Sequence, residues 1–244
     1  MSVAVITVPA FASARDGVRH FFGTRRHADS LAFEAGVPAR HSVAKGHGWL
    51  LSVRQVHGTD ALVVDRPLTE SDQFPGGWDA LVTDQPGVTV AVRTADCVPV
   101  LVHDPGRRVV AAIHAGWRGA VAGIVPKTME LMASRFGSAR SDLRVSIGPS
   151  AGPCCYEVDD PVLEHLRAGL PDWQSVVRDY RGHKARLDLK ALIRRQVEEL
   201  GLSALSVSAV NLCTICNDQL FYSYRREGRV NGTMVSGITL LSNR

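Results

Sequence analysis

The sequence predicts a mixed α/β fold, and three observations support this prediction. Three runs rich in Val, Ile and Thr, as a buried sheet requires, follow one another at Val88–Ala95, Pro99–His103 and Arg108–His114. After Trp117 the apolar residues recur with the period of a helix. No repeat, low-complexity tract or long linker divides the chain, so we expect residues 1–244 to form a single domain with mixed β-sheets flanked by helices.

The chain before these runs is expected to form short strands joined by polar segments. Residues 24–48 are polar and only weakly periodic, with a helical turn predicted at Ser30–Ala35. Arg66–Gly77 contains two Pro and two Gly and is predicted to be a loop. The predicted strands are Val3–Val8, Val18–Gly23, Leu50–Val56 and Ala61–Asp65.

The chain after Trp117 is expected to alternate between helices and strands. Ile124, Thr128 and Met132 share a helical face, within which Pro126 indicates either a kink or a late helix start. Gly137 is expected to end this helix. The further predicted helices are Asp160–Ala168 and Asp188–Leu200, and the predicted strands are Leu143–Ile147, Ala204–Val210, Phe221–Tyr224 and Met234–Leu241.

Composition and charge exclude several classes of protein. The formal charge of +4 is spread along the chain and aromatic residues make up 6%, which does not suit a nucleic-acid surface. Five cysteines, two of them adjacent, do not form a disulfide framework and fit a reducing cytoplasm. No apolar run approaches the ~18 residues of a membrane span. The apolar start has no basic residue before it and is interrupted by Pro9, unlike a secretory signal.

His57, Cys97 and His114 are candidate metal ligands because each lies at or near the end of a predicted strand. Imidazole and thiolate are the side chains that zinc prefers. Their wide separation in sequence does not suit a zinc finger, whose ligands come in close pairs. It suits a catalytic site assembled from neighbouring strands, in which a fourth position stays open for water or substrate.

The same side chains also fit a nucleophilic site. Cys97 would be a thiolate activated by His114, and Asp96 or another acceptor would orient the imidazole ring. A metal site and a Cys–His dyad both require these groups within a few ångströms of each other. The sequence therefore leaves both interpretations open.

Two further motifs carry less information. Cys213 and Cys216 form a C-x-x-C, but no second C-x-x-C completes a structural zinc site, so we expect these two thiols to be structural and unpaired. The turn Gly116–Gly119 precedes a predicted helix, whose free amides would bind an anion with help from Arg118. Its glycine spacing is neither that of a dinucleotide fingerprint nor that of a P-loop.

Taken together, the motifs resemble those of the YfiH-like, or laccase-domain, proteins, which are also called polyphenol oxidase or purine nucleoside phosphorylase proteins. The resemblance runs from about residue 18 to the C-terminus. The matching motifs are Q-V-H-G at 55–58, D-A-L-V-T at 79–83, T-A-D-C-V-P-V at 94–100, H-A-G-W-R-G at 114–119, I-G-P at 147–149 and F-Y-S-Y-R-R at 221–226.

The resemblance implies a fold similar to the catalytic domain of cytotoxic necrotizing factor and a zinc site at His57, Cys97 and His114. It implies phosphorolysis of adenosine, inosine and guanosine, with adenosine deamination as a side activity. It also implies that Arg93, Tyr224 and Arg225 lie near substrate or phosphate. To this we add that the carboxylate of Asp96 would stabilise the positive charge that develops on the sugar. We expect a monomer whose partners are a purine nucleoside and phosphate.

The chain departs from the family pattern in two places. Residues 25–30 replace the family's Gly-Gly-Val-Ser segment, and Thr233 follows Gly232 where the family has Arg. Three other functions remain as alternatives. One is a Cys-His amide hydrolase in peptidoglycan-precursor editing. Another is a copper-dependent, laccase-like polyphenol oxidase, since one Cys and two His also bind copper. The third is a non-catalytic binding or scaffold protein with a retained metal site, which is favoured only if the departure at Thr233 removes activity.

Overall fold

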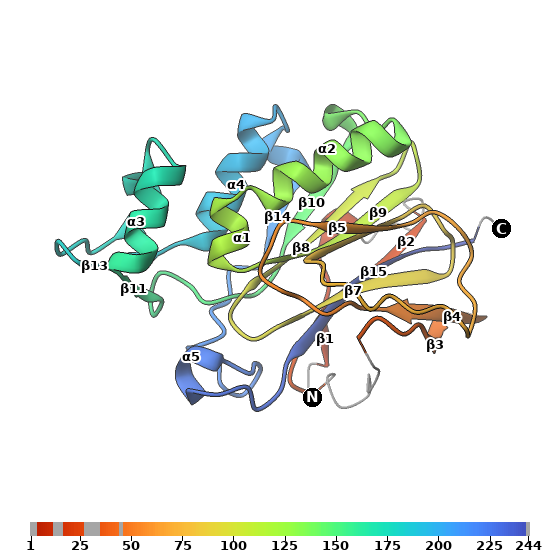
Figure 1. Cartoon of the computed structure of the whole chain (residues 1–244), viewed down its shortest axis with the longest axis horizontal. Helices are drawn as coiled ribbons and strands as arrows, with labels where there is room; N and C mark the ends of the chain where they lie inside the picture. Colours follow the sequence, from red (N-terminus) through yellow and green to blue (C-terminus); the bar gives the residue numbers. More distant parts are fainter. Residues whose placement is uncertain (1–3, 12–16, 27–34, 44–45, 243–244) are drawn as a thin grey trace.

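The computed structural model describes residues 4–11, 17–26, 35–43 and 46–242, and within it two six-stranded sheets lie face to face (Figure 1). The first sheet joins the two ends of the chain, because β15 lies between β2 and β7. In sheet order its strands are β1 (Val5–Ile6), β2 (Val18–Gly23), β15 (Met234–Leu240), β7 (Val88–Thr94), β4 (Gly46–Leu51) and β3 (Ala39–Val43).

Most of the strand ends that carry the candidate site belong to the second sheet. Its strands are, in sheet order, β14 (Val207–Ala209), β10 (Arg144–Ile147), β8 (Val98–Asp104), β9 (Val109–Ala115), β6 (Ala80–Thr83) and β5 (Ala61–Val64). A small third sheet contains β11 (Glu157–Asp159), β13 (Lys184–Leu187) and β12 (Val177–Arg178). The predicted mixed α/β class is confirmed, since both large sheets contain parallel and antiparallel pairs.

The second sheet is buried on both faces, and this explains its continuous apolar runs. All seven residues of β8 and all seven of β9 are buried. Along β8, Val100 and Val102 belong to the core beneath the helices, whereas Leu101 between them belongs to the core between the two sheets. Successive side chains of a strand point to opposite faces, so a strand buried on both sides has no polar positions to alternate with.

Helices cover the outer face of the second sheet. The helices are α1 (Trp117–Val121), α2 (Ile124–Phe136), α3 (Asp160–Gly169), α4 (Leu189–Glu199) and α5 (Tyr224–Glu227), of which α1, α2 and α4 lie over this sheet in Figure 1. Pro126 falls in the first turn of α2, and Gly123 before it has a φ of 79°, so the alternative of a late helix start is the correct one. The Asp188 carboxylate accepts a hydrogen bond from the amide of Ala191 and caps α4.

Some predicted elements differ from the structure. The strand expected at Leu50–Val56 begins earlier and ends at Leu51, since the chain then turns away to build the site. Phe221–Tyr224 is not a strand but leads into the one-turn helix α5, which Ser223 caps. Residues 204–206 form a 3₁₀ turn before the short β14. Most of the turn expected at Ser30–Ala35 lies outside the described residues. Across the described ranges, no helix combines the length and the apolar character that a membrane crossing needs.

The buried His20 on β2 predicts an acid-sensitive contribution to stability. Burial lowers the pKa of its ring from 6.5 to about 4, and the neutral Nε2 accepts a hydrogen bond of 2.8 Å from the amide of Val8. Between about pH 6.5 and pH 4 the His20 ring is protonated in the unfolded chain but not in the folded chain. The free energy of unfolding therefore decreases as the pH is lowered through this range. His20→Gln keeps an acceptor for the Val8 amide but does not titrate in this range. When the pH is lowered from 7 to 4.5, we expect its free energy of unfolding, measured with urea, to decrease by about 2 kcal/mol less than that of wild type. Equal losses in both proteins would contradict this assignment.

Candidate functional site

Strand register brings three of the site residues together. In the β8–β9 pair Val98 lies opposite Ala115, so Cys97, one residue before β8, lies beside the end of β9 that carries His114. In the β6–β9 pair Ala80 lies opposite Ile113. Asp79 therefore faces His114 from the other side, and its carbonyl accepts a 2.7 Å hydrogen bond from the His114 amide.

The buried carboxylate of Asp79 connects the second sheet to the loop that carries His57. Its oxygens accept backbone hydrogen bonds of 2.9 Å from His57 and 2.6 Å from Gly58, and a side-chain hydrogen bond of 2.7 Å from Nδ1 of His114. The backbone of His57 has a φ of 61°, a conformation that a non-glycine residue adopts only when neighbouring contacts hold it. Asp79 supplies these contacts for His57. Because it also binds Nδ1 of His114, only Nε2 of that ring is left to bind a metal ion or the Cys97 sulfur.

The ligand atoms of His57, Cys97 and His114 all lie within 4.8 Å of one another. The two imidazole rings meet edge to face with centroids 4.8 Å apart, and the Cys97 sulfur lies 3.8 Å from Nε2 of His57. The structure thus brings together the three side chains that the sequence singled out as a metal site. This group could hold a metal ion, and the hydrogen bond from His114 to Asp79 would orient one of its ligands.

The electrostatics of these groups favour a bound cation. Burial raises the pKa of the Cys97 thiol, but hydrogen bonds with His114 and His57 outweigh it and lower that pKa to about 7. Burial lowers the pKa of His114, but its hydrogen bonds with Asp79 and Cys97 raise it to about 9. These shifts favour the charged form of each group, a thiolate at Cys97 and a proton on His114 next to the Asp79 carboxylate, and a metal cation could take the place of that proton.

Two glycines of the H-A-G-W-R-G motif allow the loops to meet at the site. A Cβ at Gly116 would lie 2.8 Å from a ring carbon of His57 and 3.2 Å from the Cys97 sulfur. A Cβ at Gly119 would lie 2.7 Å from the carbonyl oxygen of Gly58. The motif thus requires glycine where side chains and backbone approach closely. The prediction that Gly116–Gly119 is a turn before a helix is wrong, because α1 begins inside the motif at Trp117 with Gly116 as its N-cap. This helix has only five residues, so the anion site expected at its first amides has little helix dipole behind it.

A cavity of about 580 Å³ opens over these three side chains. This volume lies within the range of small-molecule sites. All eight residues predicted for the site line it: His57, Arg93, Asp96, Cys97, His114, Arg118, Tyr224 and Arg225. Arg54 and Tyr156 line it as well, so the wall carries four arginines.

The sequence matches the model of the family described as multi-copper polyphenol oxidoreductase laccase over residues 37–241. The chain belongs to this family. The resemblance that the motifs indicated is thereby confirmed.

Known members of the family and its neighbours show what this laccase-domain chain is similar to. It is 38% identical to purine nucleoside phosphorylase YlmD of Geobacillus stearothermophilus, over 75% of this chain and 69% of that protein. It is 32% identical to adenosine deaminase RL5 from an unknown prokaryotic organism, over 93% and 96% of the two chains. The solved structure of the Geobacillus YlmD superposes with a TM-score of 0.79 at 29% identity, covering 99% of this chain and 98% of that one.

The carboxylate of Asp96 in this laccase-domain chain is occupied by protein donors. One oxygen accepts a 2.6 Å hydrogen bond from the Thr214 hydroxyl, and the other accepts 2.9 Å from the Ser223 hydroxyl and 2.7 Å from the amide of Arg225. Asp96 itself has a φ of 92°. Its hydrogen bonds hold the tight turn before Cys97 against the C-terminal segment, and they position this turn rather than aim a free charge at the cavity.

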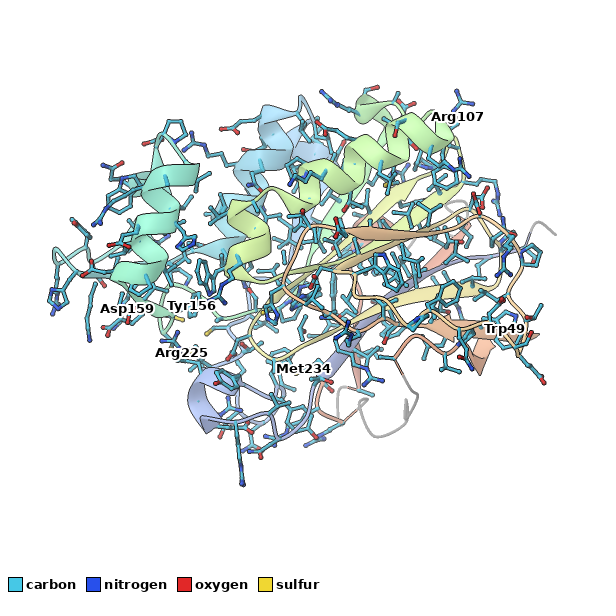
Figure 2. All side chains as sticks on the ribbon, viewed as in Figure 1. Trp49, Arg107, Tyr156, Asp159, Arg225 and Met234 are labelled. Carbon is cyan, nitrogen blue, oxygen red and sulfur yellow. The ribbon has the colours of Figure 1, made fainter. Side chains whose placement is uncertain are left out.

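Besides Asp79, the residues of the site that the sequence did not single out as functional include Gln55, Tyr156 and Arg54 in the cavity wall. The side-chain amide of Gln55 both donates to the carbonyl and accepts from the amide of Arg93, each at 2.8 Å, and so fixes β7 beside the His57 loop. The ring of Tyr156 lies under the guanidinium of Arg225 at 5.0 Å, and both are labelled in Figure 2. Arg54 lies on the same loop as Gln55. Polar residues just outside an apolar run are the sequence signal for Gln55 and Asp79, but their partners lie far away in the sequence.

The expectation that Cys213 and Cys216 have no partner pair is wrong. Cys154 and Cys155 lie beside them, and the four sulfurs are all within 4.8 Å of one another. The prediction failed because it searched for a second C-x-x-C, whereas the second pair is two adjacent cysteines on another loop.

Proposed function

We propose that this chain is a zinc-dependent purine nucleoside phosphorylase. The observation that supports this proposal best is the combination of a His-Cys-His cluster with four arginines around one cavity of about 580 Å³. A doubly or singly charged phosphate needs such cations, and a nucleoside needs a volume of this order. Relatives named as purine nucleoside phosphorylases support the same reaction class.

The donor set fits zinc. Two imidazoles and one thiolate are borderline and soft ligands, and a set of three leaves a fourth position open towards the cavity. Asp79 holds His114 by its Nδ1, as is usual for metal-bound histidines. When bound, zinc would supply a Lewis acid for an oxygen of phosphate or of water.

The arginines are proposed to bind and orient phosphate. Arg93 is half-buried on β7, and the side chain of Gln55 hydrogen-bonds to its backbone. The backbone that carries the guanidinium is therefore fixed in position. Arg118 and Arg225 also line the cavity and are exposed, and Arg118 packs over Trp117 and Arg225 over Tyr156. Bidentate guanidinium contacts would hold two oxygens of phosphate and leave a third directed at the sugar.

The nucleoside is proposed to lie with its ribose over the His-Cys-His cluster. Phosphate oxygen would bond to C1′ as the bond from C1′ to the base nitrogen breaks, and the base would leave with that electron pair and accept a proton. Tyr224 and Trp117 offer rings against which the purine can pack. Asp96 is proposed to position Cys97 and Arg225 through its hydrogen bonds instead of stabilising the sugar directly.

Product analysis with and without phosphate tests this proposal. Inosine, adenosine and guanosine are expected to give the free base and ribose 1-phosphate, and removal of phosphate is expected to suppress base release strongly. Adenosine is expected to give some inosine even without phosphate, as an activated water suffices for deamination. Chromatography of the sugar products decides the outcome. Free ribose formed at equal rates with and without phosphate would instead make the protein a hydrolase.

The lowered pKa of Cys97 supports one second candidate, a cysteine amide hydrolase. In metal-free protein its thiolate lies beside the His114 ring, as in a Cys–His dyad. The phosphorylase and the amide hydrolase differ in how easily the Cys97 thiol can be alkylated. Zinc at the cluster would slow alkylation of Cys97 by iodoacetamide, whereas a hydrolase would be alkylated readily and would lose amide-cleaving activity.

The copper oxidase suggested by the family description is less well supported. Four-electron reduction of oxygen requires several coppers, which are bound largely by histidine. Within the described part of the chain, the groups able to hold a metal are one with two histidines and one made only of cysteines.

A further inference from the structure

We propose that Cys154, Cys155, Cys213 and Cys216 form a second metal site that binds one zinc ion and has a structural role. The four sulfurs lie within 4.8 Å of one another, and none of the four cysteines is in a disulfide. Four thiolates fill the coordination shell of zinc and leave no position for water or substrate. Such a closed site stabilises a fold and does not take part in a reaction.

The distances between sulfurs fit a tetrahedral metal better than a disulfide. A zinc–sulfur bond of ~2.3 Å places the sulfurs of a tetrahedral site about 3.8 Å apart. The sulfur of Cys216 lies 3.4 Å from that of Cys154 and 3.1 Å from that of Cys155. A disulfide would need one of these pairs at ~2.05 Å and would leave the other two thiols alone.

The second sheet brings the two cysteine pairs together. β10 and β14 are parallel neighbours, and their pairing ends with Ile147 opposite Ala209. Beyond the strands, Ser150 and Cys213 form a further parallel bridge. The turns that follow β10 and β14 therefore start side by side at the same end of the sheet. The first turn carries the adjacent cysteines, and the second carries the C-x-x-C pair.

A backbone amide points at one of the sulfurs. The amide of Gly152, on the turn that carries the adjacent cysteines, donates to the Cys213 sulfur at 3.3 Å. This contact holds the two cysteine-bearing turns against each other where the metal would lie.

Basic side chains lie next to the cluster, and Lys190 among them offsets part of the net charge of −2 that four thiolates and one zinc ion would carry, whereas Arg186 and Arg226 are each also paired with a carboxylate. The half-buried Lys190 donates to the carbonyl oxygens of Val210 and Leu212 at 3.2 and 2.9 Å, just before the C-x-x-C turn. Arg186 donates to the carbonyl of Cys154, and Arg226 donates to carbonyls in the C-x-x-C turn. A partly buried anionic centre requires compensation of this kind.

The position of the cluster indicates what the metal would stabilise. The amide of Ala151 donates to the carbonyl of Asp96 at 2.9 Å, and Thr214 donates to its carboxylate. One turn leads directly to Tyr156 in the cavity wall. A zinc ion that joined the two turns would therefore fix the wall of the candidate site without touching its substrate.

Metal counts in cysteine variants test the proposal separately from any nucleoside activity. Protein purified under reducing conditions from zinc-containing medium is expected to hold two zinc ions per chain. Cys97→Ala, which damages only the His-Cys-His site, is expected to retain one. Cys216→Ser is expected to lose one, and the double variant is expected to hold none. One zinc ion in wild type that Cys97→Ala removes would overturn the proposal.

Cobalt substitution gives a second measurement that does not depend on the folding of Cys216→Ser. In the Cys97→Ala protein, Co²⁺ alone is expected to give the strong sulfur-to-cobalt charge-transfer bands and the d–d bands of a tetrahedral tetrathiolate. Absence of these bands would overturn the proposal. So would a stoichiometric Cys154–Cys216 or Cys155–Cys216 disulfide in the mass spectrum of the unreduced protein, or iron or copper bound in place of zinc.

Discussion

Replacing His114 with Ala is expected to reduce the rate of inosine phosphorolysis by at least about 100-fold, by analogy with the loss of one preorganised stabilising group. His114 is 3% exposed and contacts both Cys97 and the Asp79 carboxylate, so its loss removes one ligand and leaves a buried carboxylate without its main partner. Because the ring acts at the reacting centre, we expect the fall mainly in kcat rather than in KM.

The measurement is steady-state release of hypoxanthine at saturating phosphate. His183→Ala is the matched control, since His183 is an exposed loop residue that does not line the candidate cavity. Metal content measured on the same samples separates loss of the ligand from loss of the fold. A variant with wild-type kcat would show that the reaction takes place elsewhere.

Replacing Asp79 with Asn is expected to destabilise the protein by about 3 kcal/mol, as when one partner of a buried ion pair is removed. The carboxylate of Asp79 accepts hydrogen bonds from the amides of His57 and Gly58 and from Nδ1 of His114. The side-chain amide of Asn would place its own N–H groups against some of these donors, which would then lose their acceptor. Burial tends to raise the pKa of Asp79, but hydrogen bonds from His114 and Gly58 hold it below its usual value, so the native charge is important. Activity and metal affinity are expected to fall by about 10- to 100-fold.

Urea unfolding and zinc titration of Asp79→Asn check both parts of this expectation. Asp65→Asn is the control, because Asp65 pairs with Arg135 at 2.6 Å on the surface, where ion pairs contribute little. If Asp79→Asn unfolds at the same urea concentration as the control, the carboxylate does not hold the His57 loop as we describe.

The fold class and the side chains that meet at the candidate site could be predicted from the sequence, because both depend on local signals. The runs rich in Val and Ile in β8 and β9 reflect strands buried along their whole length, and this feature is visible without a structure. Histidine and cysteine at strand ends are equally visible. The H-A-G-W-R-G motif also carries the two glycines that the close approach of the loops requires.

What could not be predicted depends on pairing between distant segments. Asp79 faces His114 only because β6 and β9 are antiparallel in one particular register. The adjacent cysteines meet the C-x-x-C pair only because β10 and β14 are parallel neighbours. Phe221–Tyr224 has the composition of a strand, but Ser223 caps a helical turn there and binds Asp96, so tertiary contacts override local preference.

The central place of β15 has a consequence for how the protein forms. Thr89 and Thr239 are 150 positions apart and share a hydrogen bond of 2.6 Å, and β15 separates β2 from β7 across the whole first sheet. During synthesis, β2 and β7 leave the ribosome long before the strand that joins them. Until then both present unpaired edges and apolar faces, which is the situation in which nascent chains depend on chaperones. Closure of the sheet then requires contacts between distant parts of the chain, so folding is expected to be slow compared with that of helical proteins of similar stability.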